Sequence, residues 1–394
     1  MFSRKVVENL KNSSAIRAMF EEGARLKKEF GEANVFDFSL GNPDPPPPEG
    51  TIAALEDLVA NPPPGIHGYM NNAGYADVRA KIAERLAGKS GVPLTQENIV
   101  MTCGAGGGLN VVLKALLDPG DEVIIFSPFF VEYKFYTENH GGRIVVVPTE
   151  EGSFLPDLDA LERGISPRTK AVILNTPNNP TGVVYPAELL AGMEDVLQKK
   201  GREYGRVIYL VSDEPYRDIV YDGVEAPEVL RIFQNALVGY SFSKSLSLPG
   251  ERIGYVAASS RIEDCATLCE ALAFTNRTLG FVNAPSLFQR LVGRSLDAKV
   301  DVGIYRERRD LLYGHLVKLG FSCVKPGGAF YLFPKSPLPD TAAFKQMALK
   351  HKIILVPGNG FGCPGYFRLA YCVGIETIKN SLQAFTALAK EAGL

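Results

Sequence analysis

Short apolar runs alternate with stretches of helical periodicity from about residue 98 to residue 241, and this alternation constrains the fold most. The runs are NIVMTC, EVIIF, RIVVVP, AVILN, VIYLVSD and ALVGYSF, and their central residues are mostly apolar rather than alternating with polar ones. Such strands are buried on both faces, as in a parallel sheet that helices cover on both sides. The sequence therefore predicts an α/β fold with a mostly parallel sheet.

The rest of the chain predicts a second, smaller domain, because 394 residues exceed the roughly 150 residues of a typical domain. After residue 290 we expect an α+β unit with helices over 299–319 and 341–351, the segments FSCVKPGGAFYLF, IILVP and FRLAYC, and a final helix. Before the sheet we expect a helix over 14–30, a short strand in VFDFSL, a loop to about residue 73 and a helix over 75–87.

Composition argues against several classes of protein. With 42 Lys and Arg against 44 Asp and Glu, the chain lacks the basic excess that nonspecific nucleic-acid binding requires. The apolar runs are too short for a membrane-spanning helix, and the N-terminus has no apolar signal segment. The six Cys form no C-x-x-C pair and the four His lack metal-ligand spacing. We therefore expect a cytoplasmic protein that binds no metal, nucleic acid or membrane.

Residues able to bind a ligand follow four of the predicted strands, and ligands of open parallel sheets bind at the carboxyl ends of strands. The first set is the glycine run 104–108, whose backbone N–H groups could face an anion such as a phosphate. A purely structural turn explains this run equally well. A P-loop and a dinucleotide-binding turn fit poorly, because no Lys follows and Leu109 replaces the third glycine.

The second and third sets offer hydrogen-bonding side chains. Asn178 and Asn179 lie between prolines in NTPNNPTG, which is either a polar turn or a rigid hydrogen-bonding wall. Asp213 ends the run VIYLVSD, and Tyr216 follows three residues later. A carboxylate at a buried strand end needs a partner. For Asp213, that partner is either a helix N-terminus or a protonated ring nitrogen.

The fourth set is Ser241, Ser243 and Lys244 in SFSK, with Arg252 eight residues beyond the lysine. Burial in this uncharged stretch would lower the pKa of Lys244 and make its amine nucleophilic. The serines and Arg252 would bind an anion. Taken together, the four sets suit pyridoxal 5′-phosphate, whose aldehyde forms a Schiff base with lysine and whose ring nitrogen pairs with an acid.

In the order and spacing of these motifs, from Gly41 to Arg368, the chain resembles the fold type I, class I and II pyridoxal-phosphate-dependent aminotransferases, the aspartate aminotransferase-like family. The resemblance implies a seven-stranded type of sheet in a large cofactor domain over residues 46–287. It also implies a small domain over 288–394, to which the N-terminal segment 1–45 contributes.

The resemblance assigns roles to single residues. Lys244 would form the Schiff base and Asp213 would pair with the pyridinium nitrogen. Tyr216 and Asn179 would hydrogen-bond the phenolate oxygen of the cofactor. The remaining implied cofactor contacts are Phe130, stacked on the ring, and Ala105, Gly106, Ser241, Ser243 and Arg252 at the phosphate.

Arg368 matches the arginine that binds the substrate α-carboxylate in this family, and its planar fork suits a carboxylate. Gly41 and Asn179 would complete the substrate contacts, and Asn42 is a nearby polar candidate. Tyr69, five residues before Gly74, matches a tyrosine that reaches the phosphate of the neighbouring subunit. The resemblance therefore implies a homodimer with shared active sites.

The implied activity is the transfer of an amino group from an amino acid to a 2-oxo acid such as 2-oxoglutarate, in two steps through an aldimine and a ketimine. A β-lyase or other carbanion chemistry is the alternative, because both reactions begin with the same proton abstraction. A nucleotide-binding dehydrogenase and a non-catalytic binding protein are more distant alternatives. The dehydrogenase lacks the acidic residue that should end EVIIF.

The sequence leaves the preferred amino donor open among alanine, glutamate, aromatic and other amino acids. One branch of aspartate aminotransferases places a lysine where this chain has Gly106. That difference argues against aspartate, unless a second cation comes from elsewhere, such as the partner subunit.

Overall fold

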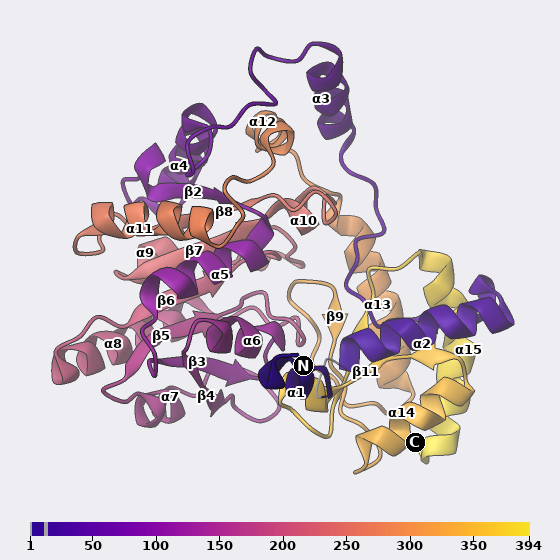
Figure 1. Cartoon of the computed structure of the whole chain (residues 1–394). Helices are drawn as coiled ribbons and strands as arrows, with labels where there is room; N and C mark the ends of the chain where they lie inside the picture. Colours follow the sequence, from indigo (N-terminus) through magenta and orange to yellow (C-terminus); the bar gives the residue numbers. More distant parts are fainter. Residues whose placement is uncertain (1, 12–14) are drawn as a thin grey trace.

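A seven-stranded sheet forms the centre of the larger part of the molecule in the computed structural model, which describes residues 2–11 and 15–394 (Figure 1). The sheet order is β2-β8-β7-β6-β5-β3-β4. Neighbouring strands from β7 to β4 are parallel, whereas β8 runs antiparallel to both β7 and β2. The prediction of an α/β fold with a mostly parallel sheet is confirmed. The strands are β2 (Ile99–Thr102), β3 (Glu122–Ser127), β4 (Arg143–Pro148), β5 (Thr169–Leu174), β6 (Tyr209–Asp213), β7 (Ala236–Ser241) and β8 (Gly254–Ala258).

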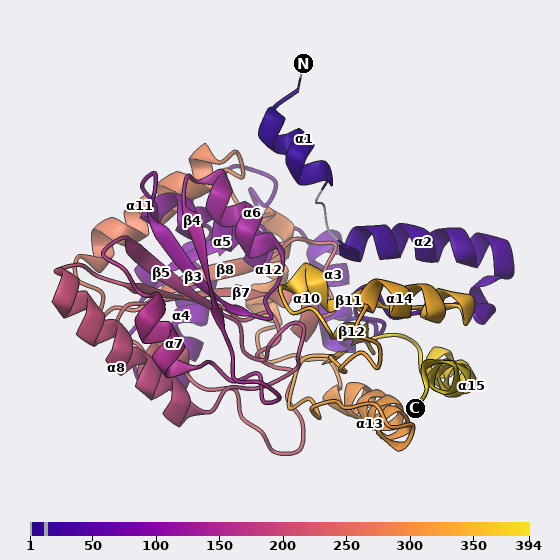
Figure 2. The same cartoon turned by 90° about the horizontal axis from the view of Figure 1, so that it is seen from below.

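Helices cover both faces of this sheet, as Figure 2 shows. On one face lie α5 (Gly104–Leu116), α6 (Glu132–Asn139) and α11 (Cys265–Thr278), and on the other lie α4 (Ala76–Ser90), α7 (Leu158–Gly164) and α8 (Ala187–Tyr204). Within β3, Val123 and Ile125 pack toward the first group, while Ile124 and Phe126 pack toward the second. Burial on both faces explains why the strand is apolar throughout.

Two sequence-based expectations about this part were incomplete or wrong. The strand β8 was not predicted, because GYVAA is short and rich in small residues. The loop expected up to residue 73 contains the helix α3 (Glu49–Ala60), so that interpretation was wrong. Pro48 precedes its first turn with a fixed φ, and Leu58 is fully buried, which together favour the helix. Leu58 belongs to the same hydrophobic cluster as Leu291 of α12 (Ser286–Arg294).

The smaller part contains a three-stranded antiparallel sheet, β11-β12-β9, and a two-stranded parallel sheet, β1-β10. Because β1 pairs with β10, residues near the N-terminus lie beside the C-terminal region. The domain boundaries themselves stay a prediction. The elements are α2 (Ala15–Phe30), β1 (Phe36–Asp37), α13 (Val302–Lys318), β9 (Tyr331–Leu332), α14 (Thr341–Lys350), β10 (Ile353–Ile354), β11 (Val356–Pro357), β12 (Phe367–Ala370) and α15 (Ile375–Ala392).

Residue 14, where the first predicted helix begins, lies outside the described residues. The helix α1 (Arg4–Lys11) precedes this gap and contacts α6, where Lys5 Nζ donates a hydrogen bond to the carbonyl of Glu138. No helix among the described residues combines the length and the apolar character that crossing a bilayer requires. The remaining short elements are η1 (Glu32–Asn34), η2 (Gln96–Asn98), α9 (Val229–Ile232), α10 (Phe242–Ser245) and η3 (Gly358–Phe361).

Candidate active site

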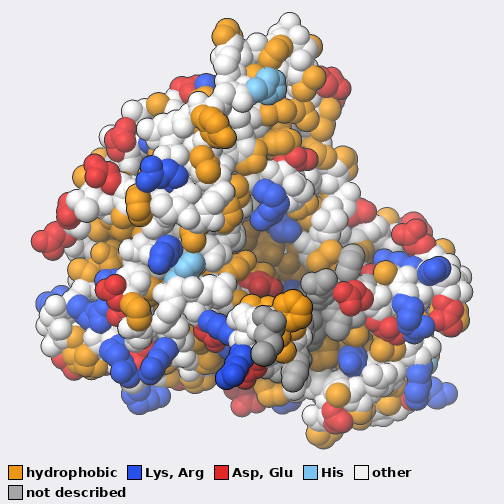
Figure 3. All heavy atoms as spheres, viewed as in Figure 1, with side chains coloured by type: hydrophobic (Ala, Val, Ile, Leu, Met, Phe, Trp, Pro, Cys, Tyr) orange, Lys and Arg blue, Asp and Glu red, His pale blue; other side chains and the backbone are white. Residues whose placement is uncertain are grey.

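A cavity of about 270 Å³ lies where the carboxyl ends of β5, β6 and β7 face the smaller part of the molecule. The space-filling view shows the surface hollowed between the two parts (Figure 3). The predicted cofactor and substrate contacts line this cavity, with the exception of Tyr69 and the nearby candidate Asn42. These lining residues are Gly41, Ala105, Gly106, Phe130, Asn179, Asp213, Tyr216, Ser241, Ser243, Lys244, Arg252 and Arg368.

Lys244 lies on α10, a single helical turn that begins directly after β7. Ser241 caps this turn, because its side chain accepts a hydrogen bond from the backbone N–H of Ser243. The Lys244 Nζ donates a 2.7 Å hydrogen bond to the carbonyl of Gly41 and forms no ion pair with a described residue. Burial lowers the pKa of the Lys244 amine to about 8. The amine is therefore far more readily available in its neutral, nucleophilic form than an exposed lysine would be.

Asp213 ends β6 inside the protein. A turn over residues 215–218 follows the strand instead of a helix, so the alternative of a helix N-cap is wrong. Its Oδ2 accepts a 2.6 Å hydrogen bond from Tyr133 Oη, whereas Oδ1 is buried without a hydrogen-bond partner. Burial raises the pKa of this carboxyl to about 7, although the bond from Tyr133 opposes the rise. A buried carboxylate oxygen without a partner calls for a donor from a ligand.

The sequence did not identify Tyr133, which holds Asp213 in place. Tyr133 lies three residues beyond Phe130, at the turn that opens α6, and their rings meet edge to face at a centroid distance of 5.6 Å. Residues three apart share one face of a helix, so this spacing was the available signal. It was missed because nothing local to residue 133 indicates that α6 faces the end of β6.

The glycine run 104–108, for which the sequence predicted a phosphate contact, forms the first turn of α5. These glycines are therefore part of the helix rather than a separate turn. Gly104 has a φ of 71°, and a Cβ there would lie 2.8 Å from Arg252 Nη2. Glycine therefore allows the arginine to approach the helix N-terminus. Ser241 Oγ and Ser243 Oγ lie 2.6 Å apart on the same side of the cavity. Backbone N–H groups, hydroxyls and a guanidinium together make a strong anion site.

Arg368 lies on β12 across the cavity from Asp213 and is only 2% exposed. Its Nη1 donates to Asn179 Oδ1 at 3.0 Å and its Nη2 to the carbonyl of Ser39 at 2.6 Å, while its Nε has no partner. No described acidic side chain forms an ion pair with this guanidinium, and burial lowers its pKa. A buried cation without a counterion is costly, which favours an anionic ligand beside it.

The hydrogen bond to Arg368 uses the carbonyl oxygen of the Asn179 amide, so the amide nitrogen stays available to the cavity. Asn175, which the sequence did not single out, fixes the loop: its Oδ1 accepts from the Asn179 backbone and its Nδ2 donates to the Asp213 carbonyl. The Tyr216 hydroxyl lies 2.7 Å from that of Tyr331, another residue that sequence analysis missed.

Two further candidates lie elsewhere. Asn42 lines a neighbouring hollow beside Asp44 and Cys372 rather than the cavity itself. Tyr69 does not line the cavity of its own chain, and its side chain is 95% exposed on the surface.

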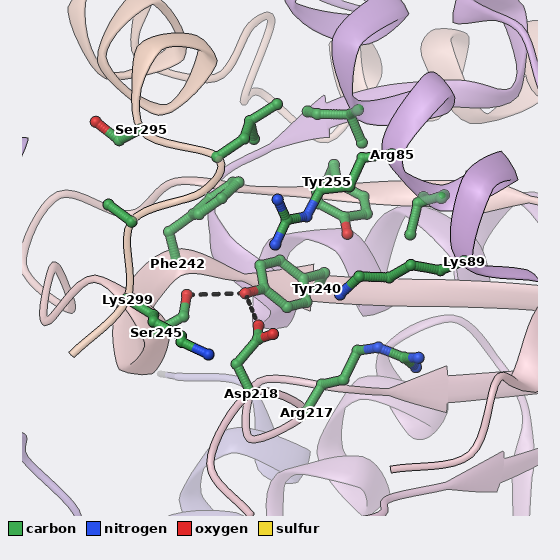
Figure 4. A pocket seen from close by; sticks show the side chains of 14 residues that line it. Arg85, Lys89, Arg217, Asp218, Tyr240, Phe242, Ser245, Tyr255, Ser295 and Lys299 are labelled. Carbon is green, nitrogen blue, oxygen red and sulfur yellow. Dashed lines mark hydrogen bonds between the residues drawn. The ribbon is translucent and has the colours of Figure 1, made fainter. Parts of the chain in front are cut away.

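A second hollow lies behind α10, and we call it the rear hollow (Figure 4). Its centre is Tyr240, whose hydroxyl donates to Asp218 and lies 2.8 Å from Ser245 Oγ, which is then the donor of the second hydrogen bond. Ser245 directly follows Lys244, so these bonds support the lysine turn from behind. Arg85, Lys89, Arg217 and Lys299 surround this group.

The residues of the cavity fit pyridoxal phosphate. The unpartnered Asp213 oxygen matches a ring N–H, the first turn of α5 with its neighbouring donors matches a phosphate, and the buried Lys244 amine matches an aldehyde. The unpaired Arg368 adds a place for a substrate carboxylate. The arrangement can thus hold a phosphorylated aldehyde and a carboxylate-bearing amine together.

Comparisons with known proteins identify the family and relatives of this chain. The family model described as aminotransferase class I and II matches residues 33–385. The chain is 33% identical over 386 residues to an aspartate aminotransferase of Thermotoga maritima, covering 97% of each chain. It is 34% identical over 353 residues to an aspartate/prephenate aminotransferase of Thermus thermophilus, covering 88% of this chain and 89% of that one. Its structure matches an amino transferase of Eubacterium rectale with a TM-score of 0.96 and 42% identity, over 100% of both chains.

Proposed function

This chain belongs to the aminotransferase class I and II family and is an aminotransferase, and we propose that it transfers amino groups with pyridoxal 5′-phosphate held in the cavity. The observation that carries the proposal is a set of buried groups that lack counterions, namely the Asp213 carboxylate, the Lys244 amine and the Arg368 guanidinium. In the same cavity lies an anion site at the N-terminus of α5.

Lys244 would carry the cofactor and move the substrate proton. When bound, pyridoxal phosphate supplies a carbonyl that condenses with amines and a protonated ring that accepts the electron pair of a broken Cα–H bond. With a pKa of about 8, the Nζ of Lys244 is able to accept the Cα proton of the amino acid and later to donate it, as a general base and acid. The Gly41 carbonyl holds this amine in place.

Asp213 would hold the ring nitrogen through its free Oδ1, while Tyr133 fixes the other oxygen. A positive ring nitrogen would lower the pKa of the carboxyl below the value that burial alone gives it. Tyr216 and the Asn179 amide nitrogen would donate to the phenolate oxygen. Phe130 would cover the ring.

The residues expected at the phosphate are those around the start of α5, namely Ala105, Gly106, Ser241, Ser243 and Arg252. Arg368 would bind the α-carboxylate of the substrate, since its fork faces the cavity without an acidic partner. Gly41 and Asn179 would border the same carboxylate.

The donor is proposed to be an amino acid and the acceptor a 2-oxo acid such as 2-oxoglutarate. Among the described lining residues, the cations are Lys244, Arg252 and Arg368, each of which already has a proposed role. A dicarboxylate would need a further cation. At residue 106, where a lysine could serve, a Cβ would lie 3.0 Å from Tyr136 Oη, so a phenol occupies this place. The lining residues therefore favour donors with uncharged side chains, and 2-oxoglutarate as the acceptor would need a cation from the partner subunit.

We further propose a cytoplasmic homodimer with shared active sites. The exposed ring of Tyr69 supports this assembly, because the partner subunit's Tyr69 would complete the phosphate site. All six cysteines are unpaired, as is usual in a reducing compartment.

The test begins with the visible absorption of the purified protein after incubation with pyridoxal phosphate. We expect a band that borohydride abolishes, and we expect an amino donor to yield more than one equivalent of its 2-oxo acid per active site only when an acceptor 2-oxo acid is present. A colourless protein would overturn the cofactor assignment. Stoichiometric release of ammonia without an acceptor would instead indicate a lyase.

A further inference from the structure

Tyr331, on β9, contacts both ends of the proposed reaction site. It lines the cavity, is only 2% exposed, and was not among the site residues that the sequence predicted. Its ring and its hydroxyl have different neighbours, so the side chain carries two separable contacts.

The hydroxyl of Tyr331 lies 2.7 Å from that of Tyr216, and no other described group hydrogen-bonds to it. A phenol has one proton to donate. If Tyr216 donates its proton to a ligand in the cavity, Tyr331 must supply the proton of the bond between the two phenols. Burial raises the pKa of the Tyr331 hydroxyl to about 12, so it keeps its proton at neutral pH. A bond donated to Tyr216 polarises its hydroxyl and strengthens its own donation.

The ring of Tyr331 lies beside the Arg368 guanidinium, whose carbon is 4.7 Å from the ring centroid. Phe361 also contacts this guanidinium, with its centroid 4.9 Å away. Since no acidic side chain in the described part of the chain holds Arg368, these rings and two hydrogen bonds to carbonyl oxygens fix its plane. Contact with an aromatic face is favourable for a buried cation.

Gly41 fits closely against the same tyrosine. A Cβ at residue 41 would lie 2.0 Å from Tyr331 Oη, so only a glycine lets this backbone pass the hydroxyl. The carbonyl of Gly41 accepts the hydrogen bond from Lys244 Nζ. Tyr331 therefore also borders the segment that holds the lysine.

We propose that Tyr331 is a positioning residue that joins the two halves of the site: its hydroxyl tunes the donation of Tyr216 to the cofactor, and its ring orients Arg368 for the substrate carboxylate. The inference rests on the proposed function, because both partners act on ligands of that reaction. It assigns the two effects to different atoms of one side chain, which two substitutions can separate.

The experiment compares Tyr331→Phe with Tyr331→Leu in the cofactor-loaded enzyme. The matched control is Tyr305→Phe, because Tyr305 is a fully buried tyrosine that packs on Phe330 and whose hydroxyl has no hydrogen-bond partner. The readouts are the pH titration of the visible cofactor band, the KM for the amino donor and the thermal midpoint of each variant.

We expect Tyr331→Phe to raise the apparent pKa of the band by about half a unit, because a weaker donor to the phenolate leaves more negative charge to hold the imine proton. Its KM should stay within about twofold of the wild type, because the ring remains. Tyr331→Leu should show the same spectral shift together with a KM raised about tenfold. Tyr305→Phe should change neither.

A wild-type titration in Tyr331→Phe would overturn the role of the hydroxyl, and an unchanged KM in Tyr331→Leu would overturn that of the ring. Equal shifts in Tyr305→Phe would mean that any buried hydroxyl has this effect, and would overturn the proposal as well. A wild-type enzyme without a cofactor band would instead overturn the proposed function itself, so the two failures are distinguishable.

Discussion

The two sides of β7 and α10 hold buried charges in opposite ways. In the cavity, Asp213 Oδ1 and Arg368 Nε have no hydrogen-bond partner among residues 2–11 and 15–394, and within the same residues Lys244 Nζ contacts only a carbonyl. Beside the rear hollow, the largely buried Arg217 pairs with Glu214 at 2.8 Å and with Glu228. The same strand and turn therefore separate the unpaired groups of the cavity from the paired Arg217 behind them.

This difference in pairing indicates that the cavity binds a ligand, whereas the rear hollow stabilises the fold. A buried ionic group without a partner costs folding free energy, and a ligand that supplies the missing partner recovers it. In a buried ion pair, each charge compensates the other within the fold. Removing one member leaves the other as a buried, unpaired charge, which destabilises the protein. Substitutions in the cavity should thus affect activity more than stability, and substitutions in the rear hollow should do the reverse.

The largest effect is expected for Lys244→Ala. It removes the nucleophile and the proton-transfer group together, so turnover should fall by about 10⁴-fold or more. The visible cofactor band should be lost, while the thermal midpoint of the cofactor-free protein stays at or above that of the wild type. Stopped-flow and absorption measurements on folded protein check this. Turnover within tenfold of the wild type would contradict the assignment of Lys244.

Behind the strand, Arg217→Met should reduce stability instead. Glu214 is 2% exposed and would lose its buried partner, which costs about 3–5 kcal/mol. Urea unfolding measures this loss, and turnover per folded molecule should stay near the wild-type value. The double variant Arg217→Met with Glu214→Gln is the control, since neutralising both partners should restore much of the stability. A loss of turnover without a loss of stability would break the comparison.

Across the cavity, Arg368→Ala should lower kcat/KM for the amino donor by about 10²-fold, mainly through KM, because charge-assisted hydrogen bonds to the carboxylate are lost. Arg368→Lys keeps the positive charge but lacks the planar guanidinium, so its kcat/KM should lie between the values for the wild type and for Arg368→Ala. Stability should not fall, since the guanidinium has no acidic partner among the described residues. An unchanged KM would show that another group binds the carboxylate.

The last comparison concerns the pH dependence of stability in the cofactor-free protein. The folded state lowers the pKa of Lys244 from 10.5 to about 8, so below pH 8 the folded protein holds a disfavoured charge. Between pH 8 and 10.5 the unfolded chain binds more protons than the folded one, and stability should rise with pH by up to about 3 kcal/mol.

Lys244→Met removes this titration and keeps a similar volume. The variant should therefore be more stable than the wild type at pH 7, and the gap should narrow as the pH rises through this range. Chemical unfolding at pH 7, 9 and 10 measures the gap. A gap that is constant with pH would show that Lys244 is not desolvated in the folded state.

Much of the fold followed from local patterns. Runs such as EVIIF and AVILN predicted buried parallel strands because both faces of each strand pack against helices. The strand β8 and the helix α3 did not follow. The sequence GYVAA becomes a strand because it fits between β7 and β2, where a Cβ at Gly254 would lie 2.2 Å from the Tyr240 carbonyl. That constraint comes from residues distant in sequence.

The chemistry of the site was predictable where a residue type at a strand end carried the signal, as for Asp213 and Lys244. Tyr133 and Tyr331 carried no such signal. Each is one tyrosine among 16, and its relevance depends on which distant side chain it meets. A hydrogen bond between residues 80 or 115 positions apart leaves no local pattern.

By itself, the sequence determined the α/β class, the resemblance to a family and the groups able to hold a phosphorylated aldehyde, because periodicity and residue chemistry are local properties. Only the tertiary structure decided which of these charges stay unpaired. Asp213 and Arg368 are 155 residues apart in sequence, and the absence of a counterion at each is set by the packing of everything around it. Burial without a partner is a property of the folded surroundings, and it separates the candidate site from the paired charges behind the same strand.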